Sequence, residues 1–173
     1  RRDRLVHADG LYLRRSAASG LTFRNWARGA AWYSLGLART LSLFPERDDL
    51  SDLRDELERF VHWVLPMQDK GGLWNCFLDD PSSGPETSGS AGIAAALAIS
   101  ARLGIGVREG RAAAASAAAA LVTRLTPDGF LTGAAQSNRG GEGLQRGGYR
   151  VISQMGMGLM GQLFAELSIP GRD

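Results

Sequence analysis

Asp9-Gly10-Leu11-Tyr12-Leu13 is the stretch from which the fold can be predicted, because the chain repeats its pattern twice. The repeats are Gly71-Gly72-Leu73-Trp74-Asn75 and Asp128-Gly129-Phe130-Leu131-Thr132, which places the three copies about sixty residues apart. In each copy a glycine turn precedes bulky apolar or aromatic residues, a pattern typical of a turn followed by a short extended piece. We therefore expect three similar structural units.

A helix rich in small residues is expected after each copy, beyond a polar loop. These helices should cover 28–44, 88–103 and 153–167, with two further helices at 52–65 and 109–125. The helix at 52–65 has an apolar stripe opposite charged residues, as surface helices do, and Pro66 ends it. The helix at 88–103 is apolar or small on all sides, which predicts burial all round. We expect the second and third small-residue helices to be more buried than the helix at 52–65.

Buried inner helices paired with amphipathic outer helices are the arrangement of an α/α toroid. The expected fold class is therefore all-α, a toroid of the six-hairpin barrel type with about three hairpins in this chain. A half ring would expose apolar helix faces, which monomers rarely do on a large scale. We expect residues 1–173 to form the C-terminal half of a single α/α-toroid domain, completed by a segment N-terminal to this chain or by a partner. A self-contained bundle of five helices is the alternative.

The composition is that of an ordinary globular protein, with 44% hydrophobic and 22% charged residues. A net charge of +2 and scattered arginines argue against a nucleic-acid partner. No apolar run reaches the roughly 18 residues of a membrane helix, so no membrane partner is expected. Cys76 is the only cysteine, which excludes a disulfide framework and a cysteine-rich metal site. The first residues lack an apolar segment and a starting Met, so we expect the chain to begin inside a longer sequence.

The stretch from Trp26 to Trp32 contains the strongest candidates for a binding site. Arg28 and Trp32 are four residues apart and share one face of a helix, near its N-terminus, where anions are favoured. An Arg guanidinium can hold a carboxylate with two hydrogen bonds, and a Trp can stack against a sugar ring. The alternative is a salt-bridged Arg between two core tryptophans, and composition alone does not separate the two.

Several motifs, in this order and spacing, carry a resemblance to a known family. They are Gly10-Leu11-Tyr12, Trp26-Ala27-Arg28-Gly29 with Trp32, Gln68 through Gly72-Leu73-Trp74 to Leu78-Asp79-Asp80-Pro81, and Glu86-Thr87-Ser88-Gly89-Ser90-Ala91. The chain resembles the glycoside hydrolase families of unsaturated rhamnogalacturonyl hydrolases and unsaturated glucuronyl hydrolases, over the C-terminal half of such enzymes only. The candidate substrate-binding residues are Arg14, Arg28, Trp32, Trp74, Glu86 and Ser88.

The resemblance implies an unusual hydrolysis of a small unsaturated uronyl oligosaccharide, with the rhamnogalacturonyl kind favoured, and with no metal and no cofactor. The terminal uronic acid of the substrate carries a double bond between C4 and C5. An Asp protonates C4, water adds at C5, and the resulting hemiketal breaks down and releases the next sugar. The resemblance places the donor Asp in the N-terminal half, so no catalytic residue is assigned in this chain and the fragment alone is expected to be inactive. It also implies cytoplasmic processing of imported oligosaccharides.

Two departures from the family pattern bear on the substrate. The family usually has Asn-Gly where this chain has Ala30-Ala31, so we expect a polar side chain to be missing beside the pocket. Some members have a His just after the Gly-Leu-aromatic turn, where this chain has Leu13-Arg14-Arg15. Arg14 can replace that His as a hydrogen-bond donor but not as an acid or base.

Other polar residues have both a functional and a structural interpretation. Asp79, Asp80 and Glu86 could serve as acid or base, although Asp80-Pro81 is typical of a turn, and Thr87 or Ser88 could cap the following helix. The glycine-rich stretch 136–150 is either a flexible loop or a rim from which Gln136 or Arg150 reaches substrate. His7 and His62 lack partners at metal-ligand spacing, so no metal site is expected.

Two other functions remain open from the sequence. The chain could be a non-catalytic α/α domain that binds saccharide or protein, which Ala30-Ala31 would favour. It could also belong to another toroid enzyme, such as a sugar epimerase.

Overall fold

The computed structural model describes residues 5–16, 20–45 and 47–169. They fold into three units, each a small antiparallel sheet, called the β-hairpin of its unit below, followed by a long helix. The hairpin strands are β1 (Val6–His7), β2 (Gly10–Ser16) and β3 (Gly20–Arg24) in the first unit, β4 (Asn75–Phe77) and β5 (Asp80–Pro85) in the second, and β6 (Ala134–Ala135) and β7 (Arg150–Val151) in the third. All pairings are antiparallel. The long helices that follow are α2 (Ala27–Leu43), α4 (Thr87–Arg102) and α7 (Gln154–Ser168). Two more helices, α3 (Ser51–Val64) and α5 (Val107–Val122), connect the units.

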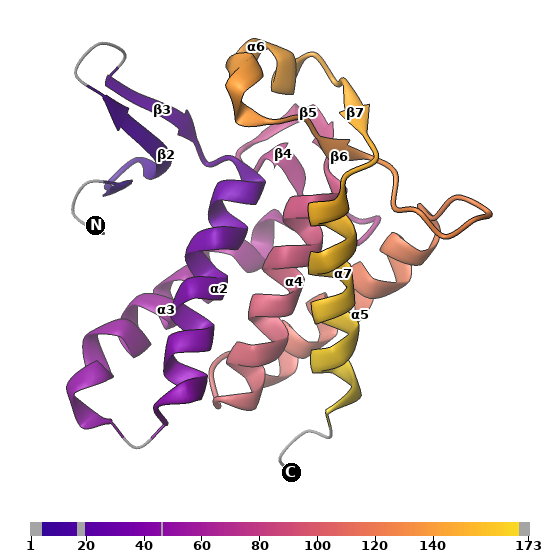
Figure 1. The fold of residues 1–173 in the computed structure, drawn as a ribbon. Helices are drawn as coiled ribbons and strands as arrows, with labels where there is room; N and C mark the ends of the chain where they lie inside the picture. Colours follow the sequence, from indigo (N-terminus) through magenta and orange to yellow (C-terminus); the bar gives the residue numbers. More distant parts are fainter. Residues whose placement is uncertain (1–4, 17–19, 46, 170–173) are drawn as a thin grey trace.

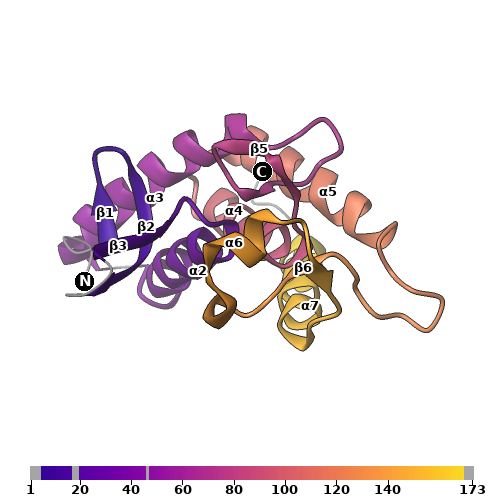
Figure 2. The same cartoon turned by 90° about the horizontal axis from the view of Figure 1, so that it is seen from above.

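The long helices lie side by side with their N-termini at the same end of the molecule. Figure 1 shows α4 between α2 and α7, with the hairpins above the three N-termini. Seen from above, α3 and α5 run along the other side of this layer (Figure 2). The structure thus has an inner row of three helices, an outer row of two, and a rim of hairpins at one end.

Helix α4 is the centre of the core, as its composition predicts. Every residue from Thr87 to Ala101 is buried, including Ile93 and Leu97. Its glycines let α2 approach closely, because a Cβ at Gly89 would lie 2.6 Å from that of Ala27, and one at Gly92 would lie 2.6 Å from that of Ala31. The run of small residues is therefore explained by close helix packing.

The repeated glycine segments form turns followed by extended pieces, as expected. Gly72 has φ +87°, and a Cβ there would lie 2.8 Å from the backbone oxygen of Ser116 in α5, so the turn requires glycine. Strand β2 begins at Gly10, β4 follows Trp74, and Leu131 forms a single bridge with Leu125.

Helix α7 is less buried than its composition predicts, so the expectation for the third small-residue helix is wrong for this chain. Its buried residues are Gly156, Leu159, Met160 and Leu163, whereas the amphipathic α3 buries Glu56, Leu57, Phe60, Val61 and Val64. Phe164 and Met155 of α7 are exposed. The reason is position: among the described residues, α7 has α4 and α5 as its main helical neighbours and lies at the edge of the inner row.

The fold is predominantly helical, as expected, but it also contains three small sheets, so the expected all-α class holds only in part. The glycine-rich stretch, expected as a loop, also holds the short helix α6 (Gly141–Arg146). Short 3-10 helices occur at Asp48–Leu50, Leu65–Met67 and Asn138–Gly140. No helix within the described ranges is long and apolar enough to cross a membrane.

Candidate functional site

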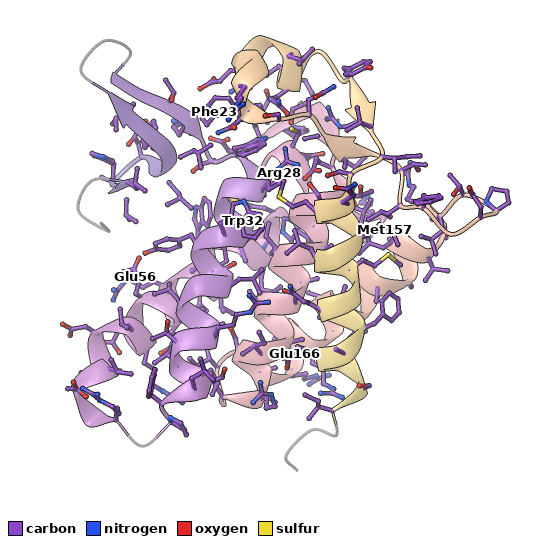
Figure 3. All side chains as sticks on the ribbon, in the orientation of Figure 1. Phe23, Arg28, Trp32, Glu56, Met157 and Glu166 are labelled. Atoms are coloured by element: carbon purple, nitrogen blue, oxygen red, sulfur yellow. The ribbon has the colours of Figure 1, made fainter. Side chains whose placement is uncertain are left out.

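Arg28 and Trp32 line one cavity at the hairpin end of α2. The cavity has a volume of about 290 Å³. Its opposite wall comes from the third unit and consists of residues 135–138, at the end of β6 and beyond it, and of Val151, Ile152, Ser153 and Met155, which lead into α7. Leu13 and Trp26 complete the lining. Figure 3 shows Arg28 and Trp32 on the part of α2 nearest the hairpins. The two residues that the sequence singled out are therefore brought together.

The Arg28 side chain is held by groups from three elements. Its Nη2 donates to the backbone oxygen of Gln136, and its Nη1 donates to Ser88 Oγ at 3.4 Å. The guanidinium carbon lies 4.6 Å from the centre of the Trp26 ring, in cation–π contact. These two hydrogen bonds use two of the five N–H donors of a guanidinium, which leaves donors for a ligand.

Arg28 is only 3% exposed, so its charge lies in a poorly hydrated place. Burial lowers the pKa of its guanidinium from the ordinary value, and the nearby Glu86 carboxylate opposes this shift. A guanidinium remains charged at neutral pH even when burial lowers its pKa. A buried, oriented positive charge at the edge of a cavity suits an anionic group, because water competes weakly there.

Trp32 lies one turn after Arg28 and is 44% exposed. It borders both this cavity and a neighbouring apolar groove with Leu11, Tyr33 and Leu37. A large aromatic face beside a fixed cation can stack on one side of a sugar ring.

Glu86 and Ser88 do not reach the cavity, which corrects the expectation that they contact substrate directly. Glu86 is the N-cap of α4 and is fully buried. Its carboxylate accepts hydrogen bonds from the backbone N–H groups of Ser88 at 2.9 Å and Ala135 at 2.7 Å, and also from Gly89 N–H and the Ser88 hydroxyl. The cap is therefore Glu86 itself, not Thr87 or Ser88, and Thr87 donates instead to the Thr132 oxygen at 2.7 Å.

Trp74 lies in the core, which contradicts the expectation that it contacts substrate. It is fully buried, and its indole N–H donates to the Val64 backbone oxygen at 2.9 Å. Arg14 lies in strand β2, where it pairs with Thr22, but its side chain lies outside the described part of the chain.

Ala30 and Ala31 are fully buried and line none of the cavities described. Ala31 faces Gly92 of α4. Ala31 therefore belongs to the α2–α4 contact, and the expected loss of a polar side chain beside the pocket stays a prediction.

The other polar candidates make structural contacts. Asp79 pairs with Arg24 at 2.8 Å and Asp80 with Arg146 at 2.5 Å. The hydrogen bond from Ser82, followed by the Arg146 charge, lowers the pKa of Asp80. Arg150 donates to backbone oxygens, including that of Ser83 at 2.6 Å, so it fastens β7 to β5 rather than reaching substrate.

His62 donates from Nδ1 to the Glu58 backbone oxygen at 2.9 Å, and His7 contacts the Tyr12 ring edge-on. Gln136 does line the cavity, but its backbone oxygen, not its side chain, holds Arg28. Within the described ranges there is no cluster of three or more His, Cys, Asp or Glu residues suited to a metal ion.

The sequence indicated only part of the wall that the third unit contributes. Ser137, Asn138, Ile152, Ser153 and Met155 line the cavity opposite Arg28. The glycine-rich stretch 136–150, for which a rim was one of two interpretations, contains Ser137 and Asn138, but no sequence signal pointed to Ile152, Ser153 or Met155.

One family model matches almost the whole chain. The family described as Glycosyl Hydrolase Family 88 matches residues 6–168. The curated protein Atu3128 of Agrobacterium fabrum is 36% identical over 119 residues, which cover 64% of this chain and 51% of that protein. The unsaturated rhamnogalacturonyl hydrolase YesR of Bacillus subtilis is 40% identical over 83 residues, covering 45% of this chain and 23% of that enzyme. The chain thus spans about half, or less, of the length of these relatives.

Solved structures share the fold at low sequence identity. A possible member of the GH105 family from Salmonella enterica has a TM-score of 0.82 and 23% identity, over 95% of this chain and 46% of that one. The unsaturated glucuronyl hydrolase of Bacillus sp. GL1, described as responsible for the degradation of glycosaminoglycan, has a TM-score of 0.70 and 21% identity, over 96% and 48% of the two chains.

Proposed function

Because this chain belongs to glycosyl hydrolase family 88, we propose that it is part of a hydrolase acting on unsaturated uronyl oligosaccharides. The substrate class follows the names of two similar proteins, an unsaturated rhamnogalacturonyl hydrolase and an unsaturated glucuronyl hydrolase. The higher identity to the first favours a rhamnogalacturonyl substrate. The observation that carries the proposal is the cavity that Arg28 and Trp32 share.

Arg28 binds the uronate carboxylate in this proposal. Its guanidinium is held in place before any ligand arrives, and it retains unused N–H donors. A carboxylate that meets such a group forms charge-assisted hydrogen bonds, and the buried position strengthens them. Trp32 stacks against the sugar ring one helical turn away, which orients the ring relative to the carboxylate.

We further propose that residues 1–173 are the C-terminal half of a single α/α toroid. The three hairpin–helix units, arranged in an inner and an outer row, support a curved half ring. The helices at both ends of the inner row carry exposed apolar residues, such as Leu43 on α2 and Phe164 on α7. The solved structures are about twice as long as the part that matches. Further helices could cover these edges and close the ring.

The chemistry is hydration of the C4–C5 double bond. A carboxylic acid gives its proton to C4, and water attacks C5 and loses a proton. The new C5 hydroxyl makes a hemiketal, whose ring C5–O bond breaks to leave a ketone at C5 and a hemiacetal at C1. The hemiacetal collapses to an aldehyde and releases the next sugar as its alcohol. In this chain Glu86 already accepts four hydrogen bonds, and Asp79 and Asp80 are in ion pairs. We assign the proton donor to an Asp of the N-terminal half, and the reaction as proposed uses no metal or cofactor.

The test follows the absorbance of the conjugated double bond. The complete natural protein is mixed with an unsaturated rhamnogalacturonyl disaccharide, an unsaturated glucuronyl disaccharide, or a saturated disaccharide as control. We expect loss of absorbance with the first and, more slowly, with the second, together with release of the second sugar. Absorbance that stays constant with both unsaturated sugars would refute the proposed reaction.

A further inference from the structure

A closed circuit of contacts joins Glu86 to Arg28. The Glu86 carboxylate accepts from the Ser88 hydroxyl, and Ser88 Oγ accepts from Arg28 Nη1. Arg28 Nη2 donates to the oxygen of Gln136, and the preceding residue, Ala135, donates its N–H back to Glu86. The circuit therefore links α2, the N-terminus of α4 and strand β6, which are the elements around the cavity.

Four of the five residues of this circuit are buried, and Gln136 is half-buried. Glu86, Ser88, Ala135 and Arg28 are all at most 3% exposed. Buried hydrogen bonds in a low-dielectric region are directional and costly to break, so they fix the geometry of the groups they join. The same carboxylate also caps α4 through Ser88 N–H and Gly89 N–H, which anchors it to the most buried helix of the molecule.

We propose that Glu86 is a positioning residue for Arg28: without touching substrate, it sets the orientation in which the guanidinium meets a uronate carboxylate. This inference rests on the proposed function. Glu86 acts along two routes, through the Ser88 hydroxyl to Nη1, and through Ala135 to the Gln136 oxygen that holds Nη2. A shorter or neutral side chain at position 86 cannot satisfy both routes and the helix cap at once.

A competing role makes the opposite prediction. If Glu86 served only as a counter-charge, it would weaken anion binding, and Glu86→Gln would tighten the binding of a uronate. Glu86→Asp, which keeps the charge on a shorter side chain, would then behave like the natural protein. Positioning predicts instead that both Glu86→Gln and Glu86→Asp weaken uronate binding, because the geometry is lost in each.

The experiment measures binding to the complete natural protein by calorimetry, at a temperature where circular dichroism shows each variant to be folded. The ligands are a saturated disaccharide ending in galacturonate and the same disaccharide ending in galactose. We expect Glu86→Gln to raise the Kd for the uronate about tenfold, the lower range for one charge-assisted hydrogen bond, and to leave the Kd for the neutral sugar unchanged.

Ser88→Ala is the milder variant, in case Glu86→Gln fails to fold. It removes only the hydroxyl that bridges Glu86 to Arg28 and leaves the other three bonds of the carboxylate possible. We expect a smaller loss of uronate binding of the same kind. Ser83→Ala is the matched control, because Ser83 is also a buried hydroxyl that joins a hairpin, at Phe77 N–H, but has no contact with Arg28.

A double-mutant comparison separates positioning from general loosening. In an Arg28→Ala background, Glu86→Gln should have no further effect on the Kd for the uronate. The proposal is overturned if the two effects add, if Glu86→Gln tightens binding, or if Glu86→Gln lowers the melting temperature while the Kd stays unchanged.

Failure of the proposed function is recognised separately, because the natural protein itself would then show no affinity for the uronate. The positioning role is still tested in that case by the NMR signal of the Arg28 Nε–H, assigned through its loss in Arg28→Lys. Positioning predicts faster solvent exchange of this proton in Glu86→Gln and Ser88→Ala than in Ser83→Ala. Equal exchange in all three variants overturns it.

Discussion

Arg28 contributes to folding as well as to the candidate site, because it is buried and donates to two distant segments. Its partners Ser88 and Gln136 lie 60 and 108 residues further along the chain. Replacing Arg28 should therefore lower stability as well as binding, since loss of the guanidinium leaves its acceptors without a donor.

We predict that Arg28→Lys lowers uronate affinity about ten- to a hundredfold, because an ammonium lacks the planar pair of donors. Arg28→Ala should do the same and also destabilise the fold by about 1–3 kcal/mol. The paired measurement is ligand binding and thermal unfolding of both variants. Arg39→Lys is the control, since Arg39 is exposed and its side chain bonds only to Gln162 among the partners described. Unchanged affinity in Arg28→Lys would remove Arg28 from the site.

Cys76 gives a prediction about pH. Burial, the largest cause, raises the pKa of its thiol to about 11, and the Glu86 charge adds to the rise. An unfolded chain loses this proton near the ordinary pKa of 8.5–9, whereas the folded chain keeps it. The thiol therefore contributes stability below about pH 9, and this contribution is lost as pH rises from about 9 to 11.

The expected loss across that window is roughly 2–3 kcal/mol of unfolding free energy. Denaturant unfolding of the natural protein and of Cys76→Ala, from pH 8 to 11, measures it, because the other titrating groups are the same in both. The natural protein should lose stability more steeply than the variant. Parallel curves would show that the thiol has an ordinary pKa in the folded protein.

At the scale of elements, the contact between α2 and α4 is the tightest feature of the core. Gly89 permits it, since an added Cβ would lie 2.7 Å from the backbone carbon of Ala27 and 2.7 Å from Glu86 Oε2. Backbone cannot move aside as a flexible side chain can, so the helices would have to separate.

We predict that Gly89→Ala destabilises the protein by at least about 1–3 kcal/mol, in spite of the better helix propensity of Ala. Gly143→Ala in α6 is the matched control, because no described atom lies within 4 Å of its added Cβ. The control should be neutral or slightly stabilising. Thermal unfolding of both variants decides the matter, and equal melting temperatures would mean that α2 and α4 are packed less closely than described.

At the scale of the whole molecule, the exposed edges of the inner row bear on activity. Helix α2 at one edge carries Arg28 and Trp32, and α7 at the other edge leads away from the cavity wall. If further helices close a ring against these edges, the cavity gains the remaining half of its wall and the proton donor.

We predict that residues 1–173 alone do not consume the double bond of an unsaturated uronyl disaccharide, and that adding the N-terminal half as a separate chain restores turnover. The measurement is the absorbance assay described above. The control adds the N-terminal half to a chain carrying Arg28→Ala, which should recover far less activity. Turnover by residues 1–173 alone, at the rate of the complete protein, would contradict the assignment of the donor to the other half.

The sequence by itself determined where most elements lie and which helix carries the candidate binding residues Arg28 and Trp32. Glycine turns, helix periodicity and the prolines are local signals, so the three units and the burial of α4 could be predicted. The spacing of Arg28 and Trp32 placed them on one helical face for the same reason. The exposed side of α7 could not be predicted, because glycines and methionines mark neither a buried nor an exposed face clearly.

Only the tertiary structure decided what each polar or aromatic residue does. Trp74, Glu86 and Ser88 belong to conspicuous motifs, yet their side chains turn into the core, and Arg150 is bound to backbone oxygens. The cavity wall opposite Arg28 comes from segments more than a hundred residues away, such as Gln136. A side chain's direction and partners depend on how distant elements pack, and a local pattern carries no information about which distant groups will meet it.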